Sequence, residues 1–208
     1  MGPPPASSTV TSFASAFHAG SGVRSGSLLR ICCFGKTVLI GGDAPISAWE
    51  QVEPSLLKAD IFRAPHHGAD ITEGNTRWSM SDFYQRVSPE VAVFSVGTNN
   101  RYGHPHAEHV RATAVGGMCR QLCTQLTTRC HDKPLALRDR ALENASRIDY
   151  AYARQISPLE VPCAGSVLIR VYPDGAISTS PPNRPGNWHD AFVARTAHPL
   201  CRSPVAKV

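Results

Sequence analysis

Short apolar runs of β-strand character recur along the central part of the chain. SLLRICCF (residues 27–34) and KTVLIGG (36–42) are joined by a short Phe-Gly-Lys connection, a spacing that predicts a β-hairpin. Residues 60–64 form another run, and residues 91–96 form a continuous apolar run typical of a strand covered on both faces. Residues 165–178, with Pro-Asp-Gly between two alternating runs, predict a second hairpin.

Segments with helical spacing lie between these strands. Residues 46–56 place apolar side chains at helical intervals, although Pro54 should interrupt or kink such a helix. Helices are also predicted near residues 79–86 and 107–115. The resulting order of strand, helix, strand, helix and strand predicts a layered α/β fold with its functional site along one edge of the sheet.

The two ends and one internal stretch differ from this pattern. The first residues are mostly Pro, Ser, Gly and Ala, which cannot bury enough apolar area to offset the entropy of ordering. Residues 135–155 are charged and rich in helix formers, as in an exposed helix or mobile insert. We therefore predict a flexible leader over 1–26, one domain over 27–179 with an insertion at about 118–163, and a disordered Pro-rich tail over 180–208.

Composition narrows the possible environments. Among 208 residues, 21 Lys and Arg against 16 Asp and Glu give a formal charge of +5, which favours phosphate-bearing partners without demonstrating them. No segment approaches the ~20 apolar residues that a membrane helix needs. The start lacks the basic and apolar regions of a secretory signal, so we expect a cytoplasmic protein without membrane association. Seven Cys, several of them near His, suit thiols and metal in a reducing compartment.

Polar residues collect where the predicted strands end. Asp43 follows the Gly41-Gly42 pair, Pro65-His66-His67-Gly68 follows the next strand, and residues 101–106 read Arg-Tyr-Gly-His-Pro-His. Divalent metals are held by carboxylates and neutral imidazoles that converge from rigid elements, and strand ends supply such rigidity. Each cluster alone is more often an ordinary loop, so it is their recurrence that indicates a metal site.

These motifs also carry a family resemblance. GGDA, PHHG and NRYGHPH follow one another in an order that resembles the C-terminal half of a metallo-β-lactamase-fold hydrolase. The likeness is to the branch that includes the soluble domain of the competence DNA-uptake protein ComEC, and it covers about residues 27–117 and 163–179. It implies part of an αββα sandwich and a centre of one or two zinc or manganese ions. Such a centre activates water against a phosphodiester or related ester.

The resemblance also implies roles for individual residues. Asp43 matches the family's metal-bridging Asp. Either His67 or His104 would be the last metal ligand, and the other would face the substrate or donate a proton. His66 and His106 are secondary candidates, better suited to supporting the ligands or the loop than to direct ligation.

A phosphate near the metal could be held by Asn100 and Arg101, although these residues could equally serve only to close their loop.

One departure from the family pattern limits what is expected of this chain. Relatives carry most ligands in an HxHxDH loop and a further His upstream of the bridging Asp, whereas only His18 precedes Asp43 here. With coordination incomplete, we expect weak metal binding and little or no activity from this chain alone. A fragment, a split gene and a degenerate relative remain alternatives, and each predicts self-association or a complementing chain that carries the HxHxDH half.

A second group of metal-binding residue types lies in the predicted insertion. Cys123, Cys130, His131 and Cys163 could form a tetrahedral structural zinc site, with Cys119 as a reserve ligand. The alternative is that these are separate buried thiols, which behave as small hydrophobes. A zinc site without the catalytic one would make the chain a non-catalytic, zinc-stabilised interaction module on the same scaffold, which is the rival hypothesis. A Cys-His protease and a dedicated nucleic-acid module have much weaker support.

Overall fold

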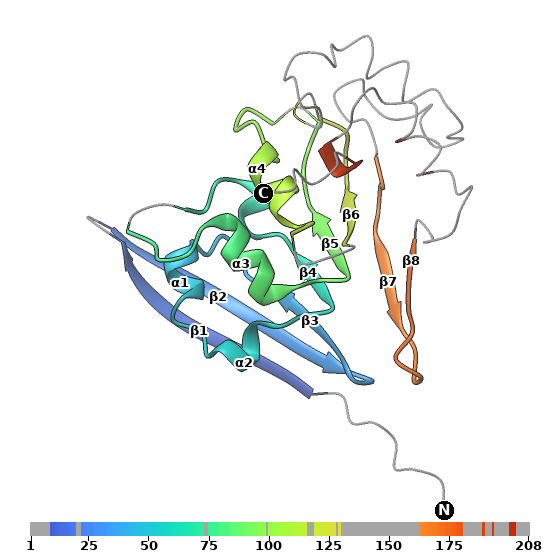
Figure 1. Ribbon diagram of the computed structural model, residues 1–208, viewed down its shortest axis with the longest axis horizontal. Coiled ribbons are helices and arrows are strands. Elements are labelled where there is room, and N and C mark those ends of the chain that lie inside the picture. Colours follow the sequence, from blue (N-terminus) through green and yellow to red (C-terminus); the bar gives the residue numbers. More distant parts are fainter. Residues whose placement is uncertain are drawn as a thin grey trace, which may run out of the picture.

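The computed structural model shows an α/β fold built on a mixed six-stranded sheet with strand order β1-β2-β3-β4-β5-β6, and a separate two-stranded sheet, β7-β8 (Figure 1). The structure describes residues 9–19, 22–72, 75–98, 100–115, 119–127, 129, 163–180, 189, 193 and 200–202, with side chains from residue 28 onward except that of residue 202. The α/β class predicted from the order of elements is therefore confirmed.

The first half of the sheet is antiparallel. β1 (Thr9–Ala19) pairs with β2 (Gly22–Cys33), which pairs with β3 (Lys36–Ile40). Phe34 and Gly35 both have positive φ angles, 49° and 75°, as a two-residue hairpin turn of the favoured hand requires, so the first predicted hairpin is confirmed. Within the leader predicted over 1–26, residues 9–19 and 22–26 lie in strands whose backbone groups are paired across the β1-β2 ladder.

The second half of the sheet is parallel. β4 (Ile61–Arg63), β5 (Val91–Phe94) and β6 (Arg120–Cys123) follow β3 in order, so the carboxyl ends of four strands share one edge. β4 and β5 match predicted strands, whereas β6 lies within the predicted insertion. Its sequence, Arg-Gln-Leu-Cys, is too short and too mixed in polarity to be distinguished from a loop.

Helices connect the strands and cover one face of the sheet (Figure 1). The predicted interruption at Pro54 is confirmed, because α1 (Ile46–Trp49) ends before α2 (Pro54–Leu57), which begins at that proline. α3 (Met80–Val87) begins with a capping box between Ser79 and Asp82. α4 (Ala107–Ala112) follows the loop that leaves β5.

The two faces of the sheet bury different partners. The helix face carries an aromatic core of Phe62 from β4 with Trp49, Phe83 and Tyr84 from the helices, at ring-centroid distances between 5.2 and 5.8 Å. On the other face, residues of β5 and β6 pack against the hairpin of β7 (Leu168–Val171) and β8 (Ile177–Ser180), which confirms the second predicted hairpin. The contact is formed by Val91, Val93 and Leu122 of the sheet and by Ala164, Val167, Ile169 and Ile177 of the hairpin and the segment before it.

Part of the predicted disordered tail also packs against the domain. His189, Val193 and Leu200 are buried, and Leu200 lies in the 3-10 turn η3 (Leu200–Arg202). Val193 and Leu200 share an apolar cluster with Phe94 and Cys163. These positions lie within the tail predicted as disordered over 180–208, and they show that a Pro-rich sequence can still bury its few apolar side chains.

None of the helices in the described ranges is long and apolar enough to cross a membrane.

Candidate functional site

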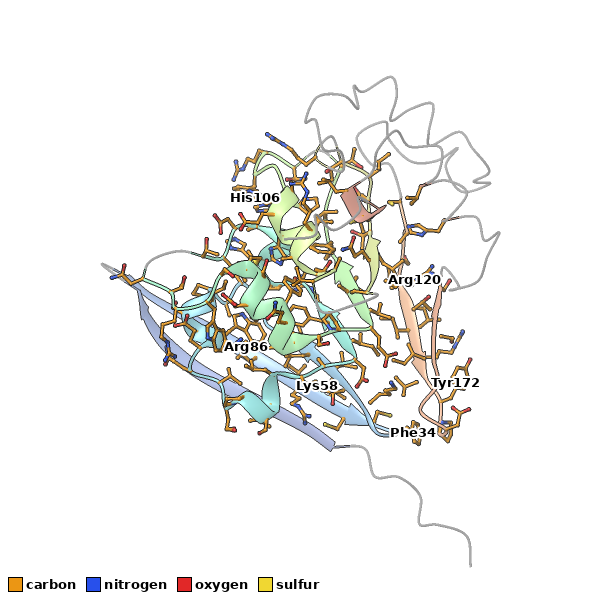
Figure 2. All side chains as sticks on the ribbon, in the orientation of Figure 1. Phe34, Lys58, Arg86, His106, Arg120 and Tyr172 are labelled. Carbon is orange, nitrogen blue, oxygen red and sulfur yellow. The ribbon has the colours of Figure 1, made fainter. Side chains whose placement is uncertain are left out.

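The three motif loops meet at the carboxyl edge of the parallel strands. The amide of His66 donates to the carbonyl of Gly42, and the amide of His106 donates to the carbonyl of Gly68, each at 2.8 Å. These bonds join the loop after β3 to the loop after β4, and the loop after β4 to the loop before α4. Figure 2 shows His106 beside α4, at the opposite end of the sheet from Phe34 in the β2-β3 turn.

The Pro65–Gly68 turn (η1) holds its two histidines in an unusual backbone conformation. His66 and His67 have φ angles of 48° and 56°, in the left-handed region that non-glycine residues rarely adopt. Each such residue costs about 1–2 kcal/mol and persists only where its surroundings impose it. Gly68 is held closely, because a Cβ atom there would lie 2.8 Å from both Phe94 and Pro105. Strain of this kind is concentrated at functional sites.

The four histidines of the two loops, His66, His67, His104 and His106, form an imidazole cluster centred on His104. The ring of His104 lies 5.7 Å from that of His66 and 5.6 Å from that of His106, measured between centroids. Burial, followed by the charges of His106, His66 and His67, lowers the pKa of His104, and the carboxylate of Asp43 acts in the opposite direction. The cluster therefore favours a neutral central imidazole, the form that can bind a metal or accept a proton.

Two ring nitrogens of this cluster are notable. The Nδ1 atom of His67 lies 2.7 Å from the carbonyl oxygen of Ser95, which can only accept, so Nδ1 carries the hydrogen and Nε2 has the lone pair. A backbone carbonyl that fixes the tautomer of a histidine in this way is typical of metal ligands. The Nδ1 atom of His104 is buried and has no hydrogen-bond partner among the described residues. A buried nitrogen without a partner is costly and indicates a site for an ion, a water or a ligand.

The two predicted phosphate-binding residues are placed differently. Asn100 uses its side chain to close its own loop: its amide nitrogen donates to the carbonyls of Gly97 and His104, and its oxygen accepts from the amide of His104. Arg101 lies against the exposed ring of Tyr102, with its guanidinium carbon 4.9 Å from the ring centroid and a 2.7 Å hydrogen bond to the phenol oxygen. Of the two, Arg101 is the side chain exposed to solvent at this edge, while Asn100 is engaged in loop closure.

Residues that the sequence patterns did not single out also support this edge. Thr124, just after β6, exchanges hydrogen bonds of 2.8 and 2.9 Å with the backbone of Val96, and the side chain of Gln125 accepts from the amide of Thr98. Both side chains fix the loop that follows β5. No motif marks them, because their role depends on the parallel pairing of β5 with a strand that was not predicted.

The donors at this edge do not form a complete metal shell. Within the residues described, no group of three or more His, Cys, Asp or Glu side chains is arranged to hold a metal ion. The fixed tautomer of His67 and the orphaned nitrogen of His104 suit ligation, but neither converges with enough other donors. The described residues therefore do not fit an occupied catalytic metal centre by themselves.

The second predicted metal group is only partly visible. Cys130 and His131 lie outside the described residues, while Cys123 and Cys163 are both buried and lie together, since the amide of Ala164 donates to the carbonyl of Cys123 at 2.7 Å. The Sγ atom of Cys163 also lies 3.7 Å from Nε2 of His189, a histidine that sequence patterns did not single out.

The remaining thiol of that region, Cys119, packs in the same apolar cluster as Cys123 and Cys163. Burial raises the pKa of its thiol to about 12, so it is protonated at neutral pH. In this protonated state Cys119 packs as a small apolar side chain. Its role as a reserve zinc ligand stays a prediction, because a bound metal would itself displace the proton.

Comparison with known proteins gives one short likeness. No protein-family model matches the chain, and no solved structure matches it. A segment of 50 residues is 40% identical to ComE operon protein 3 of Bacillus subtilis (strain 168), whose name relates it to competence. The segment is 24% of this chain and 6% of the relative, so the chain matches only a small part of that longer protein.

Proposed function

We propose that this chain contributes part of the active site of a metal-dependent hydrolase of the metallo-β-lactamase type, acting on phosphodiester or related ester bonds. The observation that carries the proposal is that the loop of Asp43 and the two loops of the imidazole cluster are joined by backbone hydrogen bonds at the carboxyl edge of the parallel strands. The charge of Asp43 also acts on His104 there. The order of the motifs and the short likeness to a competence protein support the same assignment.

The proposal extends to the fold. We infer that the mixed sheet is one layer of an αββα sandwich and that the β7-β8 hairpin belongs to the second layer. In support, the hairpin packs on the face of β5 and β6 that the helices leave uncovered. The complete sandwich would place further strands, and the loop that carries HxHxDH, beside this hairpin.

Activity is expected only when further donors are supplied. A zinc or manganese ion held by a complete donor set would provide hydroxide at neutral pH. The described residues lack such a set, so we assign no catalytic step to this chain alone. The missing donors would come from a complementing chain with the HxHxDH half or from a second copy of this chain. A cytoplasmic location, inferred from the cysteine content, is part of the same proposal.

Isothermal titration of the full chain with zinc or manganese tests this assignment. We expect weak binding that falls by about tenfold or more in Asp43→Asn and in His104→Gln, because each removes a donor. Asp174→Asn, in the turn of the β7-β8 hairpin, is the control and should bind as the wild type does. Hydrolysis of a model phosphodiester should appear or increase when a polypeptide with the HxHxDH half is added. If Asp43→Asn alters neither metal binding nor hydrolysis, the assignment is wrong.

The contact between Cys163 and His189 favours a second candidate function, the non-catalytic, zinc-stabilised interaction module. In that case Cys123, Cys130, His131 and Cys163 would hold the zinc, and the imidazole cluster would have no catalytic role. Elemental analysis separates the two candidates. Loss of stoichiometric zinc in Cys163→Ser, with none lost in Asp43→Asn, would favour the interaction module.

A further inference from the structure

The side chain of His109, on α4, is fully buried and forms hydrogen bonds through both ring nitrogens. Its Nε2 atom lies 2.7 Å from the phenol oxygen of Tyr84 on α3, and its Nδ1 atom lies 2.6 Å from the carbonyl oxygen of Ala69. Ala69 follows directly after η1, the turn that carries His66 and His67. One imidazole thus joins two helices to the first histidine-bearing loop.

The chemistry of the partners fixes the proton positions. The carbonyl of Ala69 can only accept, so Nδ1 of His109 carries the hydrogen, and Nε2 must accept from the hydroxyl of Tyr84. Burial lowers the pKa of His109 to about 4 and raises that of Tyr84 well above its ordinary value, so both remain neutral and keep these roles at physiological pH. The network has a single direction, from the Tyr84 hydroxyl through the ring to the backbone of the loop.

The bond to Ala69 lies beside two backbone hydrogen bonds of the histidine-bearing loops, one within the first loop and one between the two loops. The amide of Ala69 donates to the carbonyl of His66 at 2.9 Å, and the amide of His106 donates to the carbonyl of Gly68 at 2.8 Å. His109 lies on α4, which begins directly after His106, so its backbone is continuous with the second loop. Its ring is bonded to the first loop. The left-handed backbone at His66 and His67 needs such support, since isolated residues would relax from it.

We propose that His109 is a positioning residue, which sets the relative placement of the two loops of the imidazole cluster by donating from Nδ1 to the carbonyl of Ala69. His109 supports the same edge of the sheet at which the proposed function places the active site. Its test needs no metal and no substrate, so this inference and the proposed function can fail separately.

Two isosteric amides separate the two bonds of the ring. In His109→Asn the amide nitrogen takes the position of Nδ1 and can still donate to Ala69, whereas the partner of Tyr84 is lost. In His109→Gln the terminal amide takes the position of Nε2 and keeps Tyr84, whereas the donor to Ala69 is lost. Both variants leave the abandoned partner and the unused half of the new amide unpaired, so their losses of global stability should be comparable. Tyr84→Phe is the control that leaves the bond to Ala69 intact.

Hydrogen exchange measured by NMR on the full chain gives the readout. The amides of His66, Ala69 and His106 report the loops, and those of Ala64 and Phe83, which bond to Val93 and Ser79, report the sheet and α3. In His109→Gln we expect the loop amides to exchange at least about tenfold faster relative to the reporters of the sheet and α3. In His109→Asn and Tyr84→Phe the ratio of the exchange rates of the loop amides to those of the reporter amides should stay at the wild-type value. Equal acceleration of the loop amides in the Asn and Gln variants, or no selective acceleration in Gln, would overturn the proposal.

Discussion

The two ends of the parallel strands both carry clusters of ionisable side chains, yet the clusters are built in opposite ways. At the amino end, Lys36 lies 3.0 Å from Asp60 and 2.6 Å from Glu90, and the second oxygen of Asp60 accepts from the amide of Thr37. At the carboxyl end, imidazoles face one another, and the buried Nδ1 of His104 has no partner in the described part of the chain. Opposite charges stabilise the first cluster, whereas the second is held in place by the backbone around it.

Under the proposed function, the difference separates a structural use of polar groups from a functional one. Each residue of the amino-end cluster precedes or begins a strand, β3, β4 or β5, so the ion pairs fasten neighbouring strands where they start. At the carboxyl end, the left-handed backbone of His66 and His67 opposes folding, and the lowered pKa of His104 adds a cost in acid, below the ordinary pKa of histidine. A protein retains such features only where they do something other than stabilise the fold.

The largest expected effect comes from the carboxyl end, through Gly68→Ala. A Cβ atom there would press on Phe94 and Pro105 in addition to the cost of a positive φ of 81°, so the free energy of unfolding should fall by about 3 kcal/mol. Gly35→Ala is a matched control at the other end of the sheet, with φ of 75° and nothing within 4 Å of the added carbon, and should cost about 1 kcal/mol. Urea denaturation of both variants measures the difference, and equal losses would show that Gly68 is not closely packed.

The second largest effect is expected from acid, which should lower the free energy of unfolding through His109 near the carboxyl end. His109 binds a proton below about pH 6.5 when unfolded but only below about 4 when folded, so the unfolded state takes up more protons between these values. The free energy of unfolding should therefore fall by about 3 kcal/mol as pH drops from 6.5 to 4. His109→Asn, which does not titrate, should lose most of this slope and keep the smaller part due to His104. An unchanged slope in that variant would rule out His109 as its source.

Two carboxylates at opposite ends allow a direct comparison. Asp60→Asn weakens the bonds to Lys36 and to the amide of Thr37 and should cost about 1–2 kcal/mol. Asp43→Asn removes an exposed carboxylate at the site and should change stability by less than about 0.5 kcal/mol. Thermal melts of the two variants test this, and a larger loss in Asp43→Asn would reverse the assignment of structural and functional ends.

The smallest effect is expected for Lys36→Met. Its ammonium group is partly exposed, and such ion pairs contribute about 1 kcal/mol or less. The difference in the free energy of unfolding between Lys36→Met and the wild type should become smaller as salt is raised from low to physiological concentration, because exposed charges are screened. Denaturation at two ionic strengths gives this comparison, and a salt-independent difference would point to lost packing of the lysine stem instead.

Local patterns were sufficient for much of the fold. The hairpin at the start of the domain, the break at Pro54 and the capping-box helix α3 each depend on residues close together in sequence, and these elements were predicted. β6 and the buried part of the tail were not, because their residues acquire a role only when the sheet and its apolar cluster have formed.

The candidate site divides in the same way. Asp43, His66, His67 and His104 were identified because their residue types and positions after strands suggest ligand chemistry. His109, Thr124 and Gln125 are ordinary polar residues in sequence, and their function arises from contacts with segments far along the chain. Sequence therefore indicates which residues bear the chemistry better than which residues orient them.

The hairpin of β7 and β8 has a consequence for synthesis of the protein on the ribosome. It covers Val91 and Leu122, although it lies far along the chain from β5 and β6. Until it emerges, one apolar side of these strands stays in contact with solvent while translation continues. Nascent chains at that stage expose an apolar surface that is prone to aggregation. We therefore expect chaperones to bind this protein most during the interval between completion of the sheet and synthesis of the hairpin.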